Sequence, residues 1–156
     1  MPPVLTPAER ALLASARRAT LATIAADGRP RLVPVCFVVI DDLIWSPLDE
    51  KPKSVTDVRS LARVRDILER PTVTVLVDQW SEDWSQLGWV RIDGHAAVVE
   101  SDAAAAAVAV AALRGKYPQY MDHGLEWRPM IRIAIDNVRS WAASPADADA
   151  TRRSIE

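Results

Sequence analysis

The feature that most constrains the fold is the dipeptide Asp27-Gly28, which stands between two runs rich in apolar and β-branched residues. Asp-Gly favours a short hairpin turn, because glycine adopts the positive φ angle of such a turn without steric cost. Residues 19–25 and 30–40 are therefore predicted to pair as antiparallel strands. Pro34 lies inside the second run and cannot donate to a ladder, so it indicates a sheet edge, a bulge or a ligand contact.

Further strand signals follow along the chain. A turn at Asp41-Asp42 predicts a third strand over residues 43–48, which makes an antiparallel meander. β-branched or alternating patterns predict three more strands, over residues 72–78, 89–100 and 130–135.

Three helices are predicted around these strands. Thr6 and Glu9 form a Thr-x-x-Glu capping box with Pro7 at the first helical position, and this helix is expected to end near Arg17 and Arg18. The helical spacing of Val58, Leu61, Val64 and Leu68 predicts a second helix before Pro71, and an alanine-rich segment from Asp102 to Gly115 predicts a third. The order lacks regular β-α-β alternation, so a doubly wound parallel sheet is disfavoured and a mainly β fold is indicated. Six antiparallel strands with peripheral helices are enough to curl into a small six-stranded barrel.

The composition narrows the class of protein further. A chain of 156 residues suits one domain, expected over residues 1–143, and the small polar residues 144–156 predict a flexible tail. A net charge of -2 gives no global attraction to nucleic acid or membrane, and no apolar run is long enough to span a bilayer. One cysteine and no signal-peptide pattern fit a cytoplasmic location.

Several kinds of site are disfavoured by the motifs that the sequence lacks. Its five glycines form neither G-x-G-x-x-G nor a P-loop, and no G-x-S-x-G elbow is present. His95 and His123 have no metal-ligand spacing, so no metal site is expected. Cys36 lies in an apolar strand and is interpreted as a core residue. We therefore expect no catalytic nucleophile.

The charged segment after residue 48 is the most informative local feature. Lys51 and Lys53 follow a predicted strand and precede a predicted helix N-terminus, an arrangement that suits an anion. The alternative is a solvated turn of mixed charge. Hydroxyl contacts from Ser46 and Thr23 would add to an anion site, although polar strand residues are usually on the surface.

The remaining cations and the tryptophans are candidates for structural or ligand-binding roles. Arg17 and Arg18 at a helix end suit either a ligand or the helix dipole. Arg91 and Asp93 share a strand face and are candidates to pair with each other. Six tryptophans against one phenylalanine is unusual, and Trp80, Trp84 and Trp89 gather in ten residues. They form either a hydrophobic plug, a subunit interface or a wall against a flat ring. Trp45 and Trp141 are expected to be ordinary barrel packing.

Taken together, these segments resemble a known family. The run Ala-Thr-Leu-Ala-Thr-Ile-Ala-Ala-Asp-Gly-Arg-Pro-Arg-Leu-Val-Pro-Val-Cys-Phe is similar to the opening hairpin of pyridoxamine 5'-phosphate oxidase-like split β-barrel flavoproteins. Four later segments resemble an actinobacterial subgroup classed as probable coenzyme F420-dependent enzymes: Asp49-Glu-Lys-Pro-Lys, Val77-Asp-Gln-Trp-Ser-Glu-Asp-Trp, Trp89-Val-Arg-Ile-Asp-Gly-His-Ala and Lys116-Tyr-Pro-Gln-Tyr. The resemblance extends from about Thr6 to Trp141.

The resemblance implies an FMN-binding-protein-like fold and a homodimer with two cofactor clefts at its interface. A flavin or deazaflavin ring would lie against the strand of Pro34, Val35 and Cys36. Ser46, Lys51 and Lys53 would meet the phosphate, the partner chain would supply some of Trp84, Trp89 and Arg91, and Arg17 and Arg18 would meet the oligoglutamate tail of F420.

The resemblance also implies the chemistry, which is hydride transfer at the cofactor ring with the protein supplying position and electrostatics. The leading hypothesis is an oxidoreductase that uses reduced F420 on a small organic acceptor. An FMN-dependent reductase or oxidase is the alternative enzyme, and a carrier of F420 or flavin without turnover is the alternative of another class. The C-terminal strand ends in Val138-Arg-Ser-Trp141 without the arginine-bearing segment of the vitamin B6 enzymes, so that activity is disfavoured.

Overall fold

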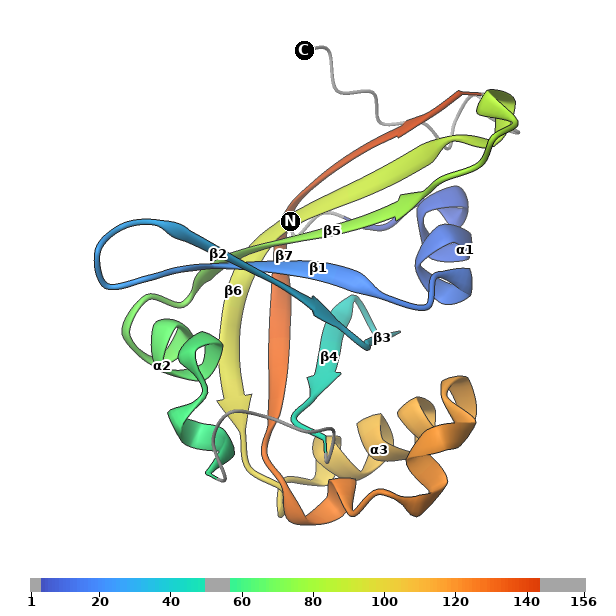
Figure 1. Ribbon diagram of the computed structural model, residues 1–156. Coiled ribbons are helices and arrows are strands. Elements are labelled where there is room, and N and C mark those ends of the chain that lie inside the picture. The colour runs from blue at the N-terminus through green and yellow to red at the C-terminus, as the bar shows by residue number, and fades with distance from the viewer. Residues whose placement is uncertain (1–3, 50–56, 144–156) are drawn as a thin grey trace.

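The computed structural model describes residues 4–49 and 57–143, which form a curled antiparallel sheet with helices around it (Figure 1). The strands are β1 (Ala19–Ile24), β2 (Pro30–Val35), β3 (Val38–Ile40), β4 (Leu43–Pro47), β5 (Thr72–Gln79), β6 (Gly88–Val99) and β7 (Met130–Ala142). The helices are α1 (Pro7–Ser15), α2 (Ala62–Glu69) and α3 (Ala104–Lys116), with short 3₁₀ turns η1 (Val58–Ser60), η2 (Trp84–Gln86), η3 (Pro118–Asp122) and η4 (Leu125–Trp127). The predicted mainly β class is confirmed.

The predicted number of strands is wrong, because the run expected over residues 30–40 is two strands. The described part of the chain contains a seven-stranded sheet in the order β2-β1-β5-β6-β7-β4-β3. Phe37 is fully buried at the break, and both its backbone N–H and its C=O bond the Tyr117 hydroxyl, at 3.1 and 3.2 Å, in place of a ladder partner. Because only Cys36 and Phe37 join the two edge strands, the sheet must curl until its edges approach each other.

The predicted turns and the first cap are confirmed. Gly28 has a φ of +84°, and Asp41 and Asp42 have φ angles of 49° and 62°. At the start of α1, the Thr6 side chain accepts from the Glu9 N–H and the Glu9 carboxylate accepts from the Thr6 N–H. These local signals set the hairpins of the sheet and the start of its first helix.

Two helix details differ from the prediction. The second helix is interrupted at Leu61, between η1 and α2, and this changes the phase of its apolar face: Leu68 is 65% exposed and Ile67 is buried. Gly115 was expected to end the third helix, but it lies inside α3, and Ala103 rather than Asp102 is the N-cap.

The sheet has an inner face, which carries the larger core, and an outer face. In β1, β5 and β6 the residues Leu21, Val75 and Ile92 point inward and are at most 2% exposed. Both α1 and α2 are fixed to inner-face residues: Glu9 Oε1 accepts from Ser140 Oγ at 2.9 Å, and Asp66 bonds Thr23. A second core lies between α3, η3 and the β3–β4 hairpin.

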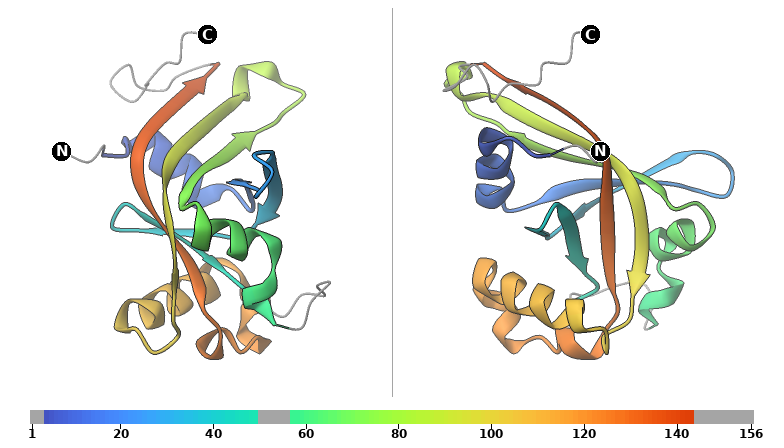
Figure 2. Two further views of the ribbon diagram at one scale, coloured as in Figure 1. Left: turned by 90° about the vertical axis from the view of Figure 1, so that its left-hand side faces the viewer. Right: turned by 180° about the vertical axis from the view of Figure 1, so that it is seen from behind.

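Strands β5, β6 and β7 extend beyond this body as an arm (residues 76–92 and 138–142), with η2 at its tip (Figures 1 and 2). The arm exists because β7 continues to Ala142, well past the predicted end at residue 135, and stays paired with β6 to Gly88. A β-bulge at Asp93 and Gly94 marks where the arm leaves the body.

Candidate functional site

A cluster of polar side chains lies around Asp49, which is two residues past the end of β4 and precedes residues 50–56. We call Asp49, Arg63, Tyr120 and Arg128 the β4–α2 corner. The Asp49 carboxylate accepts from the Tyr120 hydroxyl at 2.5 Å, and its backbone carbonyl accepts from Arg128 Nη1 at 3.3 Å. Arg63 stands in the first turn of α2, and its charge interacts with that of Asp49.

Among the described residues of the corner, positive charge exceeds negative charge, because Arg63 and Arg128 lie near the single carboxylate of Asp49. Arg63 Nε is buried and has no hydrogen-bond partner among the residues that the structure describes. Burial lowers the pKa of Arg63, and the nearby Asp49 only partly opposes this. Burial first, and then Asp49, raises the pKa of the Tyr120 phenol, so Tyr120 stays protonated. Two guanidiniums and a phenol therefore surround one carboxylate.

Lys51 and Lys53 were predicted to bind an anion, and both lie outside the described residues. The corner flanks them in the sequence, because Asp49 precedes them and Arg63 follows them. Arg63 and Arg128 are residues that the sequence interpretation missed. The sequence pattern held no signal for Arg63, because it lies between Leu61 and Val64, inside the predicted helix, and only the break at Leu61 places it in the first turn of α2.

The residues expected at the cofactor ring do not all lie on the same side of the sheet. Pro34 is exposed on the outer face of edge strand β2, which confirms the predicted edge, whereas Val35 packs against the inner core. Cys36 packs against the second core, and the buried Ser46 donates its hydroxyl to the Cys36 carbonyl at 2.9 Å. That hydroxyl proton is thus already used within the protein.

Arg17 follows the C-cap Ala16 of α1, which finishes at Ser15, and has no place in the last turn of that helix. Its guanidinium donates to the Lys116 carbonyl at 2.8 Å and lies 4.7 Å from the centre of the Tyr117 ring. Arg18 is exposed. Arg17 therefore connects the loop between α1 and β1 to the end of α3.

Lys116 lies over the Phe37 ring, with Nζ 3.9 Å from the ring centre, and donates to the Leu13 carbonyl at 3.1 Å. Burial, and to a lesser extent the positive charge of Arg17, lowers the pKa of Lys116 to about 8. The Lys116 ammonium therefore lies against the link between β2 and β3, next to Val35 and Cys36, which were predicted to contact the cofactor ring.

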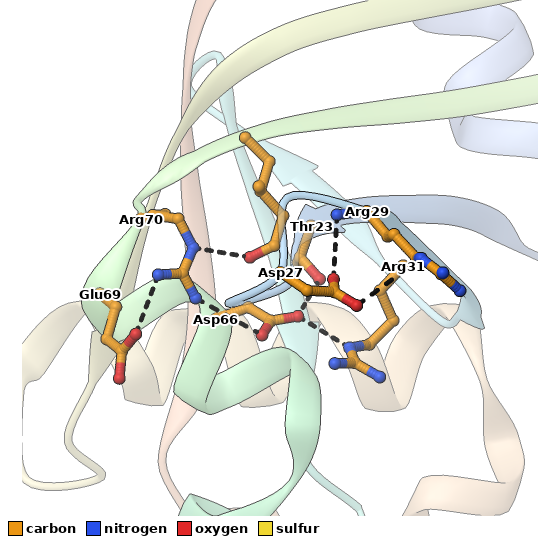
Figure 3. Close-up of polar contacts among 8 residues, drawn as sticks. Thr23, Asp27, Arg29, Arg31, Asp66, Glu69 and Arg70 are labelled. Atoms are coloured by element: carbon orange, nitrogen blue, oxygen red, sulfur yellow. Dashed lines mark hydrogen bonds and ion pairs between the residues drawn. The ribbon is translucent and has the colours of Figure 1, made fainter.

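Thr23 does not contribute to the β4–α2 corner. Its hydroxyl donates to Asp66 Oδ2 at 2.7 Å, and Arg31 Nε donates to the same oxygen at 2.8 Å (Figure 3). Arg70 lies 3.9 Å from the other carboxylate oxygen and also donates to the Ile24 carbonyl. These contacts lower the pKa of Asp66 despite burial, which opposes them. The cluster attaches α2, and with it Arg63, to the β1–β2 hairpin.

The tryptophans divide into buried and exposed groups. Trp45 is 2% exposed and packs in the core, as predicted. Trp80 and Trp84 are 69% and 68% exposed near the tip of the arm, so they are not a hydrophobic plug in this chain. Trp141 was expected to be ordinary barrel packing, but it is 37% exposed on the arm.

The suggested pair between Arg91 and Asp93 does not form. Asp93 accepts from the Thr74 hydroxyl at 2.8 Å instead. The guanidinium carbon of Arg91 lies 5.8 Å from the centre of the Trp89 ring. Arg91 is therefore placed beside an aromatic ring on the outer face of the sheet.

Within one chain, the arm tip does not meet the β4–α2 corner. The tip with η2 and the end of the molecule with α2 and α3 lie far apart in all three views (Figures 1 and 2). A cleft that uses both Trp84 and Arg63 therefore needs two chains.

In the described ranges, no three His, Cys, Asp or Glu side chains gather as a metal ion would require. None of the described helices combines the length and the apolar character needed to cross a membrane.

Comparison with known proteins agrees with this architecture. The family model described as Pyridoxamine 5'-phosphate oxidase matches residues 5–142. No curated protein matches the sequence. Similar solved structures include the conserved hypothetical protein Rv2991 from Mycobacterium tuberculosis, with a TM-score of 0.70 and 24% identity over 90% of this chain and 86% of that one.

Two further structures share the fold at lower identity. The heme storage protein HutZ from Vibrio cholerae has a TM-score of 0.67 and 16% identity, over 89% of this chain and 95% of that one. A structure described as an F420 reductase has a TM-score of 0.62 and 15% identity, over 88% of this chain and 98% of that one. Proteins that are described with different roles therefore share this fold.

Proposed function

Since the chain belongs to the pyridoxamine 5'-phosphate oxidase family, we propose that it is an oxidoreductase that passes a hydride from reduced coenzyme F420 to a small organic acceptor. The observation that carries the proposal is the β4–α2 corner, where two guanidiniums accompany one carboxylate among the described residues and Arg63 Nε is buried without a described partner. The similarity to an F420 reductase supports the same cofactor.

The corner suits the phosphate of such a cofactor. Arg63 Nε is a buried donor without a described partner, and a phosphate oxygen is the acceptor that a guanidinium binds best. Arg128 is already anchored through the Asp49 carbonyl, so its position is set before a ligand arrives. The proposal adds Lys51 and Lys53 from the segment between Asp49 and Arg63. The residues present therefore fit a phosphate-bearing cofactor.

The chain also has residues to hold a flat ring. When bound, a deazaflavin or flavin ring supplies the hydride chemistry itself. Pro34 offers a rigid, apolar strand edge without an N–H. Strand β2 ends at Val35, and the backbone then bends away from the sheet at Cys36 and Phe37. Lys116 packs against Phe37 at this bend. In the proposed site these residues position the ring. Arg17, which donates to the Lys116 carbonyl, and the exposed Arg18 would bind the acidic tail of the cofactor.

We propose that the functional unit is a homodimer. The exposed Trp84 and the half-buried Trp89 and Arg91 lie on an arm that does not reach the corner of its own chain (Figure 2). An arm that crosses to a second copy would bring indole rings against the partner's cofactor and would cover Trp84. Exposed apolar side chains of this size are typical of interfaces.

The test is a matched titration of the purified protein with F420 and with FMN, followed by turnover of reduced F420 against a panel of acceptors with activated double bonds. The proposal predicts tighter binding of F420 and oxidation of reduced F420 that depends on both protein and acceptor. Tighter FMN binding, without turnover of reduced F420, contradicts it and favours an FMN-dependent enzyme. Saturable F420 binding without turnover of any acceptor favours a carrier.

A further inference from the structure

Two tryptophans and two arginines face each other across neighbouring strands of the arm. In the β6–β7 ladder, Trp89 lies opposite Trp141 and Arg91 lies opposite Arg139. Val90, between the two β6 residues, points into the core and is 2% exposed. Because side chains alternate along a strand, the four residues share the outer face. We call Trp89, Arg91, Arg139 and Trp141 the arm tetrad.

No described helix covers the tetrad. Helix α1 packs on the opposite face of the same strands, where Glu9 bonds Ser140. Trp141 is 37% exposed and Arg139 is exposed on the outer face. The tetrad is thus accessible in the chain as described.

The two guanidiniums are an unfavourable pair unless an anion joins them. Side chains directly opposite in an antiparallel ladder have Cβ atoms about 4.5–5.5 Å apart, and like charges there destabilise the sheet. Neither Arg91 nor Arg139 forms an ion pair with a residue in the described part of the chain, where the pairs involve other arginines. Of the nearby carboxylates, Asp93 is bonded to Thr74 and Asp78 lies opposite Trp89.

The two arginines indicate an anionic group on the ligand, and the two tryptophans indicate an aromatic one. Arg91 lies beside the Trp89 ring, at 5.8 Å from its centre, so the cation and the aromatic surface are already next to each other. Flat aromatic molecules stack on indole rings, and a carboxylate accepts two parallel hydrogen bonds from a guanidinium. We infer that the arm tetrad binds a flat molecule that carries a carboxylate, as a second ligand beside the proposed cofactor.

The binding of this ligand does not depend on the proposed function. Its role as the hydride acceptor does rest on the proposed function. Trp89 and Arg91 are already proposed to face the cofactor ring of the partner, and the register adds Arg139 and Trp141 to the same wall. A molecule held there would lie beside the ring. The tetrad would then select acceptors by their negative charge.

The experiment titrates the protein with naphthalene-2-carboxylate and with the neutral naphthalene-2-methanol, and follows the indole N–H signals of the six tryptophans by NMR. We expect the acid to bind at least 10-fold more tightly than the alcohol and to shift the signals of Trp89 and Trp141, while those of Trp45 and Trp127 stay in place. Equal binding of the two probes, or shifts confined to other tryptophans, overturns the inference.

Variants at exposed positions localise the charge. Arg139→Gln should weaken acid binding at least 10-fold and leave alcohol binding unchanged, and Arg29→Gln, an exposed arginine on the β1–β2 hairpin, should change neither. Asp78→Asn should tighten acid binding because it removes a negative charge next to the site. Unchanged acid affinity in Arg139→Gln contradicts the inference.

A parallel F420 titration separates the two proposals. If Arg139→Gln binds F420 as the original protein does but loses the acid, the tetrad is a distinct ligand site. If the original protein binds F420 but shows no preference for the acid, the inference fails and the proposed function stands. If it binds the acid at the tetrad but binds no F420, the proposed function fails and the binding site stands.

Discussion

Thr23 donates its hydroxyl proton to Asp66 at 2.7 Å, and this buried bond joins the β1–β2 hairpin to helix α2 (Figure 3). Arg31 shares the same carboxylate oxygen from the neighbouring strand. Asp66 stands one turn after Arg63 in α2. The cluster therefore sets the position of the proposed phosphate-binding arginine relative to the strand that ends near Pro34.

Replacement of Asp66 tests how much this cluster stabilises the fold. Asp66→Asn should lower the free energy of unfolding by about 2 kcal/mol, because a buried carboxylate loses its charge beside two arginines. Urea unfolding measures this. Asp27→Asn, in an exposed ion pair with Arg29, is the matched control and should change stability by less than about 0.5 kcal/mol.

The same pair of proteins has a predicted pH dependence. The folded-state pKa of Asp66 is lowered, so its contribution is present above the ordinary pKa of an aspartate and is lost as pH falls through the folded-state value. The stability difference between the original protein and Asp66→Asn should therefore shrink as pH is lowered below about 4. A difference that stays constant into acid would show that the charge of Asp66 contributes nothing.

Lys116 should produce a pH dependence of the same sign, but in the alkaline range. Its folded-state pKa of about 8 is below that of an unfolded lysine, so above pH 8 the unfolded state holds more protons and stability rises with pH. The original protein should gain stability relative to Lys116→Met between about pH 8 and 9.5. This range lies below the titration of Tyr117 and Tyr120, whose pKa values are raised. A flat difference in denaturant unfolding across this range argues against a buried ammonium.

Two glycines should respond oppositely to the same substitution. A Cβ at Gly94 would lie 2.3 Å from the Ala134 carbonyl oxygen, across the β-bulge, so Gly94→Ala should destabilise by about 1–3 kcal/mol. Gly115 lies inside α3 with open space around its Cβ position, so Gly115→Ala should stabilise by about 0.5–1 kcal/mol. Thermal unfolding of both variants decides the point. Equal effects would show that the bulge does not require glycine.

The anion site predicts a loss of affinity specific to a few cations. Arg63→Ala should weaken F420 binding about 10-fold or more, since it removes a charged hydrogen bond from a partly buried site. Lys51→Ala and Lys53→Ala should weaken it in the same direction. Arg59→Ala is the control, because Arg59 lies in the adjacent turn η1, exposed and paired with Glu100. Unchanged affinity in all three variants, measured by F420 fluorescence, would show that the segment is only a solvated turn.

Local sequence signals predicted the parts of the fold that depend on local chemistry. The capping box at Thr6, the turn at Gly28 and the edge position of Pro34 each follow from the steric and hydrogen-bonding limits of one residue type, and the structure confirms them. The family resemblance supplied the barrel, and the family match confirms that resemblance.

The errors arose where distant segments decide the outcome. The break at Phe37 depends on a hydroxyl from Tyr117, 80 residues away, which no local pattern contains. The acceptors of Ser46 and Thr23, which were candidates for ligand contacts or surface positions, are likewise distant in the sequence: the Cys36 carbonyl and the Asp66 carboxylate. The opposition of Trp89 and Trp141 depends on strand register, which is set only when the sheet forms.

The central claim is that one cleft combines the β4–α2 corner of one chain with the arm of another. The most direct test mixes two variants, Arg63→Ala and Trp84→Ala, with different affinity tags, and measures F420 binding to the purified heterodimer. Each variant alone should bind weakly. Because the heterodimer has one cleft with both original residues, the account predicts one F420 per dimer at the original affinity. A heterodimer that binds as weakly as its parents contradicts a cleft shared between two chains.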